Sequence, residues 1–153
     1  KFDNGIVRVL DVEVAPGAAT LFHTHALDYP YVMMSQSLLR NEEPGKAPKE
    51  ITINAGLVGF YRALEGAYTH RFVNAGSDTF RAIGIELLRG RLSPNVTTPL
   101  ADNANLVAVL DNERVRGYRV KLAPGESLGP IAISGPSMRV VVSGGALRRV
   151  IGR

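Results

Sequence analysis

Apolar and polar residues along this chain alternate with the period of two that is typical of β-strands. Strict alternation occurs at residues 12–14 and 51–53, and side chains two positions apart on a strand point to the same face. Continuous apolar runs at residues 31–34 and 80–88 are typical of strands buried on both faces. Helical periodicity is weak. The pattern therefore predicts an all-β fold.

Turn-forming residues separate these segments. They are Pro16-Gly17, Pro44-Gly45, Asn54-Ala55-Gly56 and Asn74-Ala75-Gly76. The polar, proline-containing stretch at 41–50 is expected to be an exposed hairpin loop. Short strands joined by turns at this spacing indicate an antiparallel sandwich or barrel.

The first part of the chain is repeated at an offset of 108 residues. The segment VEVAPGA at 12–18 returns as VKLAPGE at 120–126, and residues 31–35 match residues 139–143 at the same offset. A repeat of this length indicates two copies of one domain rather than a solenoid.

The repeat predicts three parts of the chain. The first unit covers residues 1–90, a linker with two prolines covers 91–103, and a partial second unit covers 104–153. The second unit has about half the length of the first. Either the sequence is truncated there, or the half-copy completes a sheet elsewhere.

Composition limits the classes of function. The 153 residues are 45% hydrophobic and 21% charged, which is ordinary for a globular protein. No segment approaches the roughly 20 apolar residues of a membrane span, so no membrane partner is expected. The lack of cysteine excludes disulfides and thiolate chemistry. It is compatible with export, so a periplasmic or secreted location is slightly favoured over the cytoplasm.

The positive charge lies mostly in the second unit. Residues 1–110 carry 10 basic and 11 acidic side chains, whereas residues 111–153 carry 8 basic and 3 acidic ones. A basic surface exposed to solvent explains this charge balance better than a nucleic-acid-binding site does, because no aromatic residues cluster beside the arginines. We expect no nucleic-acid partner.

The three histidines are the strongest chemical signal. His23 and His25 are separated by one residue, which places both imidazoles on one face of a strand, and His70 follows 45 positions later. Imidazole is the commonest protein ligand for divalent transition metals. The three residues are therefore candidate metal ligands, although isolated histidines are more often satisfied by hydrogen bonds alone.

The second unit lacks these ligands. At the offset of 108 residues, Ile131 replaces His23 and Ile133 replaces His25. Such a unit can pack a core but cannot hold the same ion.

Together these motifs resemble those of the cupin superfamily, and the duplicated layout resembles a bicupin. In the first cupin motif five residues separate a glycine from His-x-His, as residues 18–22 separate Gly17 from His23 and His25. The second motif is matched by Gly59, His70 and Asn74. The resemblance implies a double-stranded β-helix (jelly-roll) barrel in the first unit and a degenerate, incomplete second cupin unit.

The resemblance also implies a metal site, with one departure. The glutamate that supplies a fourth ligand in cupins falls on Tyr29, and the nearest carboxylate is Asp28, one residue earlier. We expect His23, His25 and His70 to bind a divalent metal, with Asp28 as a fourth or supporting partner. Iron, manganese, nickel and zinc all remain open.

Four apolar or aromatic residues are candidate walls of a substrate pocket. Tyr29, Tyr31 and Met33 share one face of their strand, and Phe72 follows His70 by two positions. Packing in the core is an alternative explanation for the three on the first strand.

The resemblance leads to two hypotheses for function. The first is a metal-dependent oxidoreductase of the dioxygenase type that acts on a small molecule inside the first barrel. The second is a non-catalytic cupin that binds a small ligand or serves a structural role. The degenerate second unit and the exposed barrel edges predict a homodimer.

Overall fold

A computed structural model describes residues 1–89, 104–131, 133 and 135–148. These residues form eleven β-strands and no helix. The all-β prediction is therefore confirmed for the described part of the chain. None of the described residues belongs to a helix of the length and apolarity that crossing a membrane requires.

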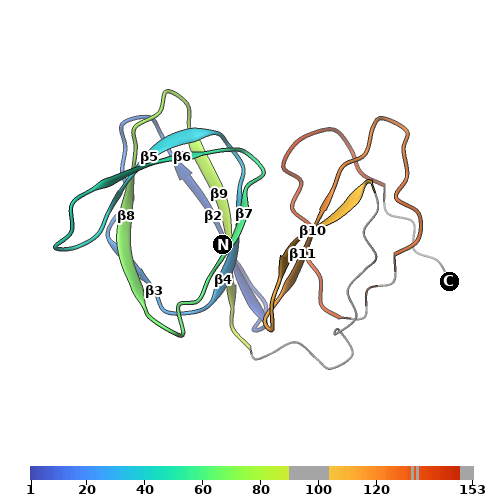
Figure 1. The fold of residues 1–153 in the computed structure, drawn as a ribbon, viewed down its shortest axis with the longest axis horizontal. Helices are drawn as coiled ribbons and strands as arrows, with labels where there is room; N and C mark the ends of the chain where they lie inside the picture. The colour runs from blue at the N-terminus through green and yellow to red at the C-terminus, as the bar shows by residue number, and fades with distance from the viewer. Residues whose placement is uncertain (90–103, 132, 134, 149–153) are drawn as a thin grey trace.

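Nine strands form a barrel of two facing sheets (Figure 1). The five-stranded sheet has the order β1 (Phe2–Asp3), β2 (Val7–Val14), β9 (Phe80–Leu87), β4 (Tyr29–Met33) and β7 (Val58–Tyr61). The four-stranded sheet has the order β3 (His23–His25), β8 (Tyr68–Asn74), β5 (Ser37–Glu42) and β6 (Lys49–Ile53).

The barrel is one long antiparallel hairpin wound on itself. Val7 pairs with Leu87, His23 with His70 and Ser37 with Ile53, so the pairs converge on the turn that follows β5. Gly45 lies in this turn with a φ of 72°, a conformation that glycine adopts without steric cost. We call residues 1–44 the outgoing arm and residues 45–89 the return arm. Two arms coiled together in this way make a double-stranded β-helix.

Alternating apolar side chains fill the space between the sheets. The buried core consists of Val14, Met33, Leu39, Ile53 and Phe80, which come from both sheets. At about 25 cal/mol per Å² of buried apolar surface, these contacts supply most of the energy that holds the arms together. The predicted strands at 12–14, 51–53, 31–34 and 80–88 all fall within or overlap strands that contribute to this core.

The polar stretch at 41–50 differs from its prediction. Asn41 and Glu42 belong to β5, and Lys49 and Glu50 to β6, so only the middle of the stretch is a loop. Asn41 is 5% exposed. A buried amide needs hydrogen-bond partners, and Asn41 has two inside the barrel, which are described below.

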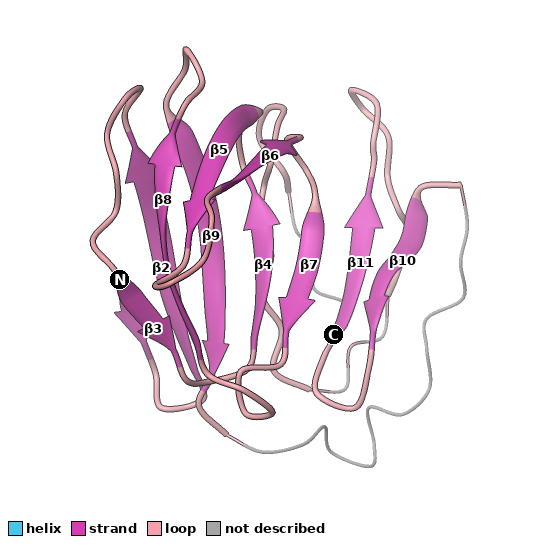
Figure 2. Ribbon diagram, turned by 60° about the vertical axis from the view of Figure 1, so that its left-hand side comes forward, coloured by secondary structure: helices cyan, strands magenta, loops and turns pink. Residues whose placement is uncertain are grey.

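The second unit places a two-stranded hairpin beside the barrel. The strands β10 (Leu106–Asp111) and β11 (Arg116–Val120) pair with each other and lie alongside β7 (Figure 2). Arg119 Nη2 donates a hydrogen bond of 2.6 Å to the Gly56 carbonyl oxygen of the first unit. The described residues after β11 form no strand. The predicted linker at 91–103 lies outside the described residues.

The repeat in the sequence is also a repeat in local structure. Asp3 pairs with Arg8 between β1 and β2, and Asp111 pairs with Arg116 between β10 and β11, again at an offset of 108. Both pairs form salt bridges, of 3.1 and 2.8 Å. In each unit an asparagine side chain then caps the turn: Asn4 Oδ1 accepts from the amide of Val7, and Asn112 Oδ1 from that of Val115.

Candidate metal centre

Two neighbouring strands carry the three histidines. His23 and His25 lie on the same face of β3, and β8 pairs with β3 so that His70 stands opposite His23. His70 is 1% exposed, whereas His23 and His25 are partly buried. The antiparallel register therefore brings the third imidazole to the pair that the sequence places on one strand.

The ring nitrogens converge on a common point. Nε2 of His25 lies 3.2 Å from Nε2 of His23 and 3.1 Å from Nε2 of His70. The three ligand atoms lie within 4.8 Å of one another. Two ligands bound at right angles to an ion at about 2.1 Å would be about 3.0 Å apart. Both distances from His25 therefore fit neighbouring ligands of one metal ion, and the three nitrogens lie close enough together to be candidate ligands.

Hydrogen bonds at the opposite ring nitrogens orient two of the imidazoles. His23 Nδ1 donates to the Leu21 carbonyl oxygen at 2.9 Å, and His70 Nδ1 donates to Asn41 Oδ1 at 2.8 Å. Each ring then carries its proton on Nδ1 and turns the lone pair of Nε2 toward the centre. Metal-binding histidines in proteins are typically held in this way.

The orienting residue Asn41 is itself fixed. Its Nδ2 donates to the Tyr68 hydroxyl at 2.7 Å, which leaves Oδ1 directed at His70. Sequence analysis did not identify Asn41 or Tyr68 as site residues. Their role depends on the pairing of β5 with β8, and neither sequence motif contains that information.

Burial keeps two of the imidazoles neutral. It lowers the pKa of His25 from 6.5 to about 4, with a smaller contribution from the nearby His23. The pKa of His70 also falls to about 4, chiefly through burial and then through His23 and His25. A neutral imidazole is the form that binds a metal. Both rings are therefore ready to act as ligands at neutral pH.

Aromatic rings surround the histidines. Tyr29 stacks on His25 with centroids 4.3 Å apart, and Tyr68 stacks on His70 at 4.4 Å. Phe72 meets the His70 ring edge-on at 4.4 Å. Tyr61 lies between the tyrosines, 5.9 Å from Tyr29 and 5.1 Å from Tyr68. Burial raises the pKa of Tyr29 above its usual value, so its hydroxyl stays protonated.

The four predicted wall residues lie in different places. Tyr29 and Phe72 contact the imidazoles directly. Tyr31 is one ring further away, 6.0 Å from Tyr29. Its ring lies against Gly59, where a Cβ atom would come within 2.2 Å of it, which explains the glycine at this point of β7. Met33 belongs to the buried core.

Asp28 does not join the three histidines, contrary to the prediction that it is a metal ligand. Its Oδ1 accepts a hydrogen bond of 2.9 Å from the Leu64 amide, and its Oδ2 lies 3.3 Å from Arg114 Nε. Neighbouring side chains on an extended segment point to opposite faces. Tyr29 faces His25, and the carboxylate of Asp28 is engaged elsewhere.

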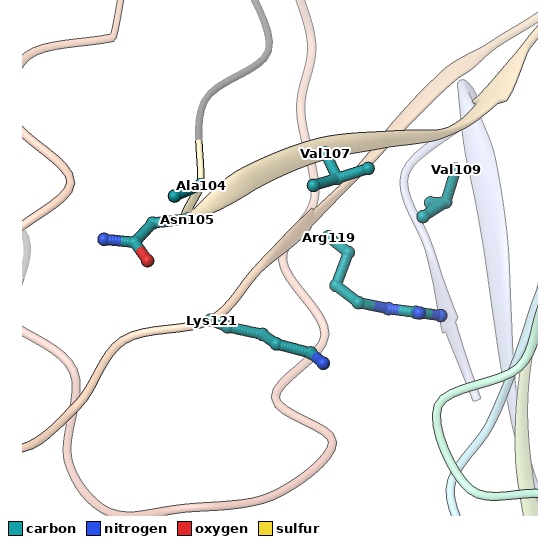
Figure 3. A pocket seen from close by; sticks show the side chains of 6 residues that line it. All are labelled: Ala104, Asn105, Val107, Val109, Arg119 and Lys121. Carbon is teal, nitrogen blue, oxygen red and sulfur yellow. The ribbon is translucent and has the colours of Figure 1, made fainter.

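A separate hollow lies on the second unit. It measures about 180 Å³ and is lined by Ala104, Asn105, Val107, Val109, Arg119 and Lys121 (Figure 3). The guanidinium of Arg119 is bound to the Gly56 carbonyl oxygen. The lining contains no histidine or carboxylate, so this hollow has no ligand set like that of the barrel.

No protein-family model matches the sequence, and no curated protein is significantly similar to it. Solved structures do match. A cupin domain from Bordetella pertussis Tohama I superposes with a TM-score of 0.51 and 25% identity, over 57% of this chain and 86% of that one. A double-stranded β-helix protein from Klebsiella pneumoniae matches with a TM-score of 0.45 and 14% identity, over 56% of this chain and 70% of that one.

A third match is the polyketide cyclase RemF from Streptomyces resistomycificus. Its TM-score is 0.41 and its identity 20%, over 55% of this chain and 59% of that one. The Bordetella match establishes the fold of the barrel as that of a cupin domain, as the motifs predicted. The bicupin layout, with a degenerate second cupin unit, stays a prediction.

Proposed function

We propose that the barrel binds one divalent transition metal through Nε2 of His23, His25 and His70 and uses it to act on a small molecule. The convergence of three Nε2 atoms, two of them oriented by Nδ1 hydrogen bonds, carries this proposal. Such an ion, when bound, supplies Lewis-acid or redox chemistry at its open coordination positions.

The protein residues supply orientation and an apolar surface. Asn41 holds the His70 ring through Nδ1, and Tyr68 holds Asn41. The rings of Tyr29, Tyr68 and Phe72 cover the imidazoles and reduce their contact with water. These aromatic faces fit a planar organic molecule better than a highly charged one.

The protein ligands carry no negative charge. Tyr29 stands where the cupin motif has its glutamate, and Asp28 is paired with Arg114. A bound divalent ion would keep its full charge, which favours a substrate that presents oxygen anions, such as a deprotonated chelating group. We propose a dioxygenase-type oxidation of such a molecule as the reaction.

The second candidate is a non-catalytic metal or ligand-binding cupin. The ring contacts of the three histidines are to one another and to aromatic residues, and Tyr29, at the position of the cupin glutamate, offers no carboxylate as an acid or base. The fold does not decide between the two, because cupin-like barrels serve many functions.

Metal analysis tests the site and oxygen uptake tests the reaction. Protein without an affinity tag is stripped with chelator, titrated anaerobically with iron(II), manganese, nickel or zinc, and analysed by mass spectrometry of the metal. We expect one ion per chain, and none in His70→Ala. Thr24→Ala is the matched control, because Thr24 lies between the two β3 histidines and bonds Thr69 instead.

Oxygen consumption is then measured with a panel of catechols, diketones and hydroxy acids. Uptake that requires both iron and an intact His70 supports the dioxygenase hypothesis. Metal binding without uptake for any compound supports the binding module. Failure of every metal to bind the stripped protein would overturn the metal-site proposal and leave only the non-catalytic cupin that binds an organic ligand or has a structural role.

A further inference from the structure

One imidazole of the metal centre is oriented differently from the other two. His23 and His70 each donate a hydrogen bond from Nδ1, whereas among the described residues none is formed at Nδ1 of His25. The His25 ring is packed against Tyr29 instead, with centroids 4.3 Å apart and ring planes at 24°. The χ2 torsion of histidine is soft, so a ring that is not held can turn Nε2 away from the centre. The orientation of His25 therefore depends on what holds Tyr29.

Tyr29 belongs to a wall of two tyrosines. It is the cross-strand partner of Tyr61 in the ladder between β4 and β7, and residues directly opposite each other point to the same face. The two rings are 5.9 Å apart. Asp28 immediately precedes Tyr29, and Arg62 immediately follows Tyr61. Because neighbouring side chains on an extended segment point to opposite faces, these two charged groups lie behind the wall, away from the histidines.

The turn of the second unit's hairpin holds both charged groups. Arg114 Nε lies 3.3 Å from Asp28 Oδ2 as an ion pair, and the two side chains are 10% and 6% exposed. The Glu113 carboxylate accepts two hydrogen bonds from the Arg62 guanidinium, one from Nη1 and one of 3.0 Å from Nη2. Figure 2 shows this turn at the same end of the molecule as the start of β4 and the end of β7. We call Glu113 and Arg114 the brace.

The brace is ordered and fits the barrel in one register. Asn112 Oδ1 accepts a hydrogen bond of 2.8 Å from the Arg114 amide, which fixes the turn. The two contacts have opposite polarity, because the barrel offers the anion Asp28 to one and the cation Arg62 to the other. A slip of one residue would place Glu113 beside Asp28, and like charges in contact are unfavourable. Removing one partner from a buried ion pair has a larger effect than removing one from an exposed pair. Arg114 should therefore matter more than Glu113.

We propose that the brace positions the metal centre: Arg114 and Glu113 hold the tyrosine wall, and the wall holds the imidazole of His25. This inference rests on the proposed metal function of the barrel and gives the second unit a part in it. Both are positioning residues, because their contacts are to Asp28 and Arg62 and not to the histidines. Without the brace all three ligands remain, so one ion still binds at saturation, but with lower affinity.

Competition with a chromogenic chelator for zinc tests the effect on the metal. Arg114→Gln should weaken zinc affinity about 10-fold, the lower end of the range for residues that orient a metal ligand. Glu113→Gln should have a smaller effect in the same direction. Arg114→Lys keeps a cation beside Asp28 and should retain most of the affinity. Glu65→Gln is the matched control, because Glu65 pairs with Arg62 from within the barrel, and it should bind zinc normally.

Fluorine NMR of metal-free protein labelled with fluorotyrosine gives a measurement that needs no metal. Each tyrosine signal is assigned by its Tyr→Phe variant. In Arg114→Gln the signals of Tyr29 and Tyr61 should shift, because the groups behind them are released. The Tyr31 signal should stay in place, since its ring lies against Gly59. A variant that is less stable but keeps the wall intact would show none of these shifts.

The outcomes separate this inference from the metal proposal. If the unaltered chain binds no metal, the metal proposal fails, and the fluorine measurement alone decides whether the brace holds the tyrosine wall. In a chain that binds zinc, both measurements should change together in Arg114→Gln. A change in only one of them, or in neither, overturns the inference, as does an equal loss of affinity in Glu65→Gln. If Arg114→Gln does not fold, the same test is made with Glu113→Gln, whose side chain is 50% exposed.

Discussion

In the first unit, Asp3 pairs with Arg8 across the hairpin of β1 and β2, and in the second Asp111 pairs with Arg116 across β10 and β11. The turns that follow also match: Gly17 and Gly125 have φ values of 74° and 79°. Yet Leu39 is fully buried and Leu147 is exposed. The described parts of the two units share their first hairpin and turn but differ in the burial of equivalent apolar positions. In the first unit, β5, which carries Leu39, pairs with β6 and β8 of the return arm, so pairing with the return arm is what buries this position.

The largest effect expected from this comparison is on stability. Leu39→Ala should lower the free energy of unfolding by about 2–5 kcal/mol, because it opens a cavity in the core. Leu147→Ala should change it by less than about 0.5 kcal/mol, because Leu147 is 64% exposed. Urea denaturation of the two variants measures the difference. Equal losses would show that the second unit has a core of its own.

Breaking the contact between Asp28 of the first unit and Arg114 of the second should have the next largest effect on the free energy of unfolding. Asp28→Asn removes the charge opposite Arg114, which leaves a buried guanidinium unpaired, and should cost about 3 kcal/mol of unfolding free energy. The metal content should remain one ion per chain, because Asp28 does not face the histidines. Denaturation and metal analysis on the same preparation check both parts. Loss of the metal with the fold intact would restore Asp28 as a ligand.

Removing the hydrogen bond that orients the His70 ring should have a smaller effect, limited to the affinity for the metal. Asn41→Leu removes the acceptor of the Nδ1 proton and should weaken metal affinity about 10–100-fold while one ion still binds at saturation. Competition with a chromogenic chelator measures the affinity. Asn54→Leu, an exposed turn residue, should bind metal like the unaltered protein. An unchanged affinity in Asn41→Leu would mean that the ring is oriented by its other contacts.

The pH dependence of the metal-free protein should differ between the units, because all three histidines lie in the first. The pKa of His25 and of His70 falls from 6.5 to about 4 on folding. Between these values the unfolded chain binds protons that the folded chain does not. The stabilising contribution is therefore complete above pH 6.5 and is lost as the pH falls toward about 4.

Urea denaturation of chelator-treated protein over this pH range checks the trend. The double variant His25→Asn/His70→Asn should show a flatter profile, because the two shifted groups are gone. A stability that stays constant or rises as the pH falls through this window would contradict the burial of these rings.

Several features of the fold could be predicted from the sequence. Alternation and turn residues predicted the strands, and the two histidine motifs predicted the cupin barrel, which the structure and the Bordetella match confirm. The spacing of His23 and His25 placed both rings on one face because side chains on a strand alternate. These properties depend on residues only a few positions apart.

Other features depended on pairing between distant segments. Asp28 is near His23 and His25 in sequence, but its carboxylate binds Leu64 and Arg114, which are 36 and 86 positions away. Asn41 belongs to a stretch that looks like an exposed loop, and only the ladder between β5 and β8 brings it to His70. No pattern within either segment contains these registers.

The sequence by itself determined the turns and placed the His23 and His25 rings on one face of β3, because both follow from local backbone geometry. The first hairpin and the Pro-Gly turn recur where the sequence recurs. Only the tertiary structure decided that His70 completes the set in the first unit and that the equivalent arm of the second unit lies uncovered. The physical reason is that burial requires a second strand, and the strand that buries β3 comes from a distant part of the chain.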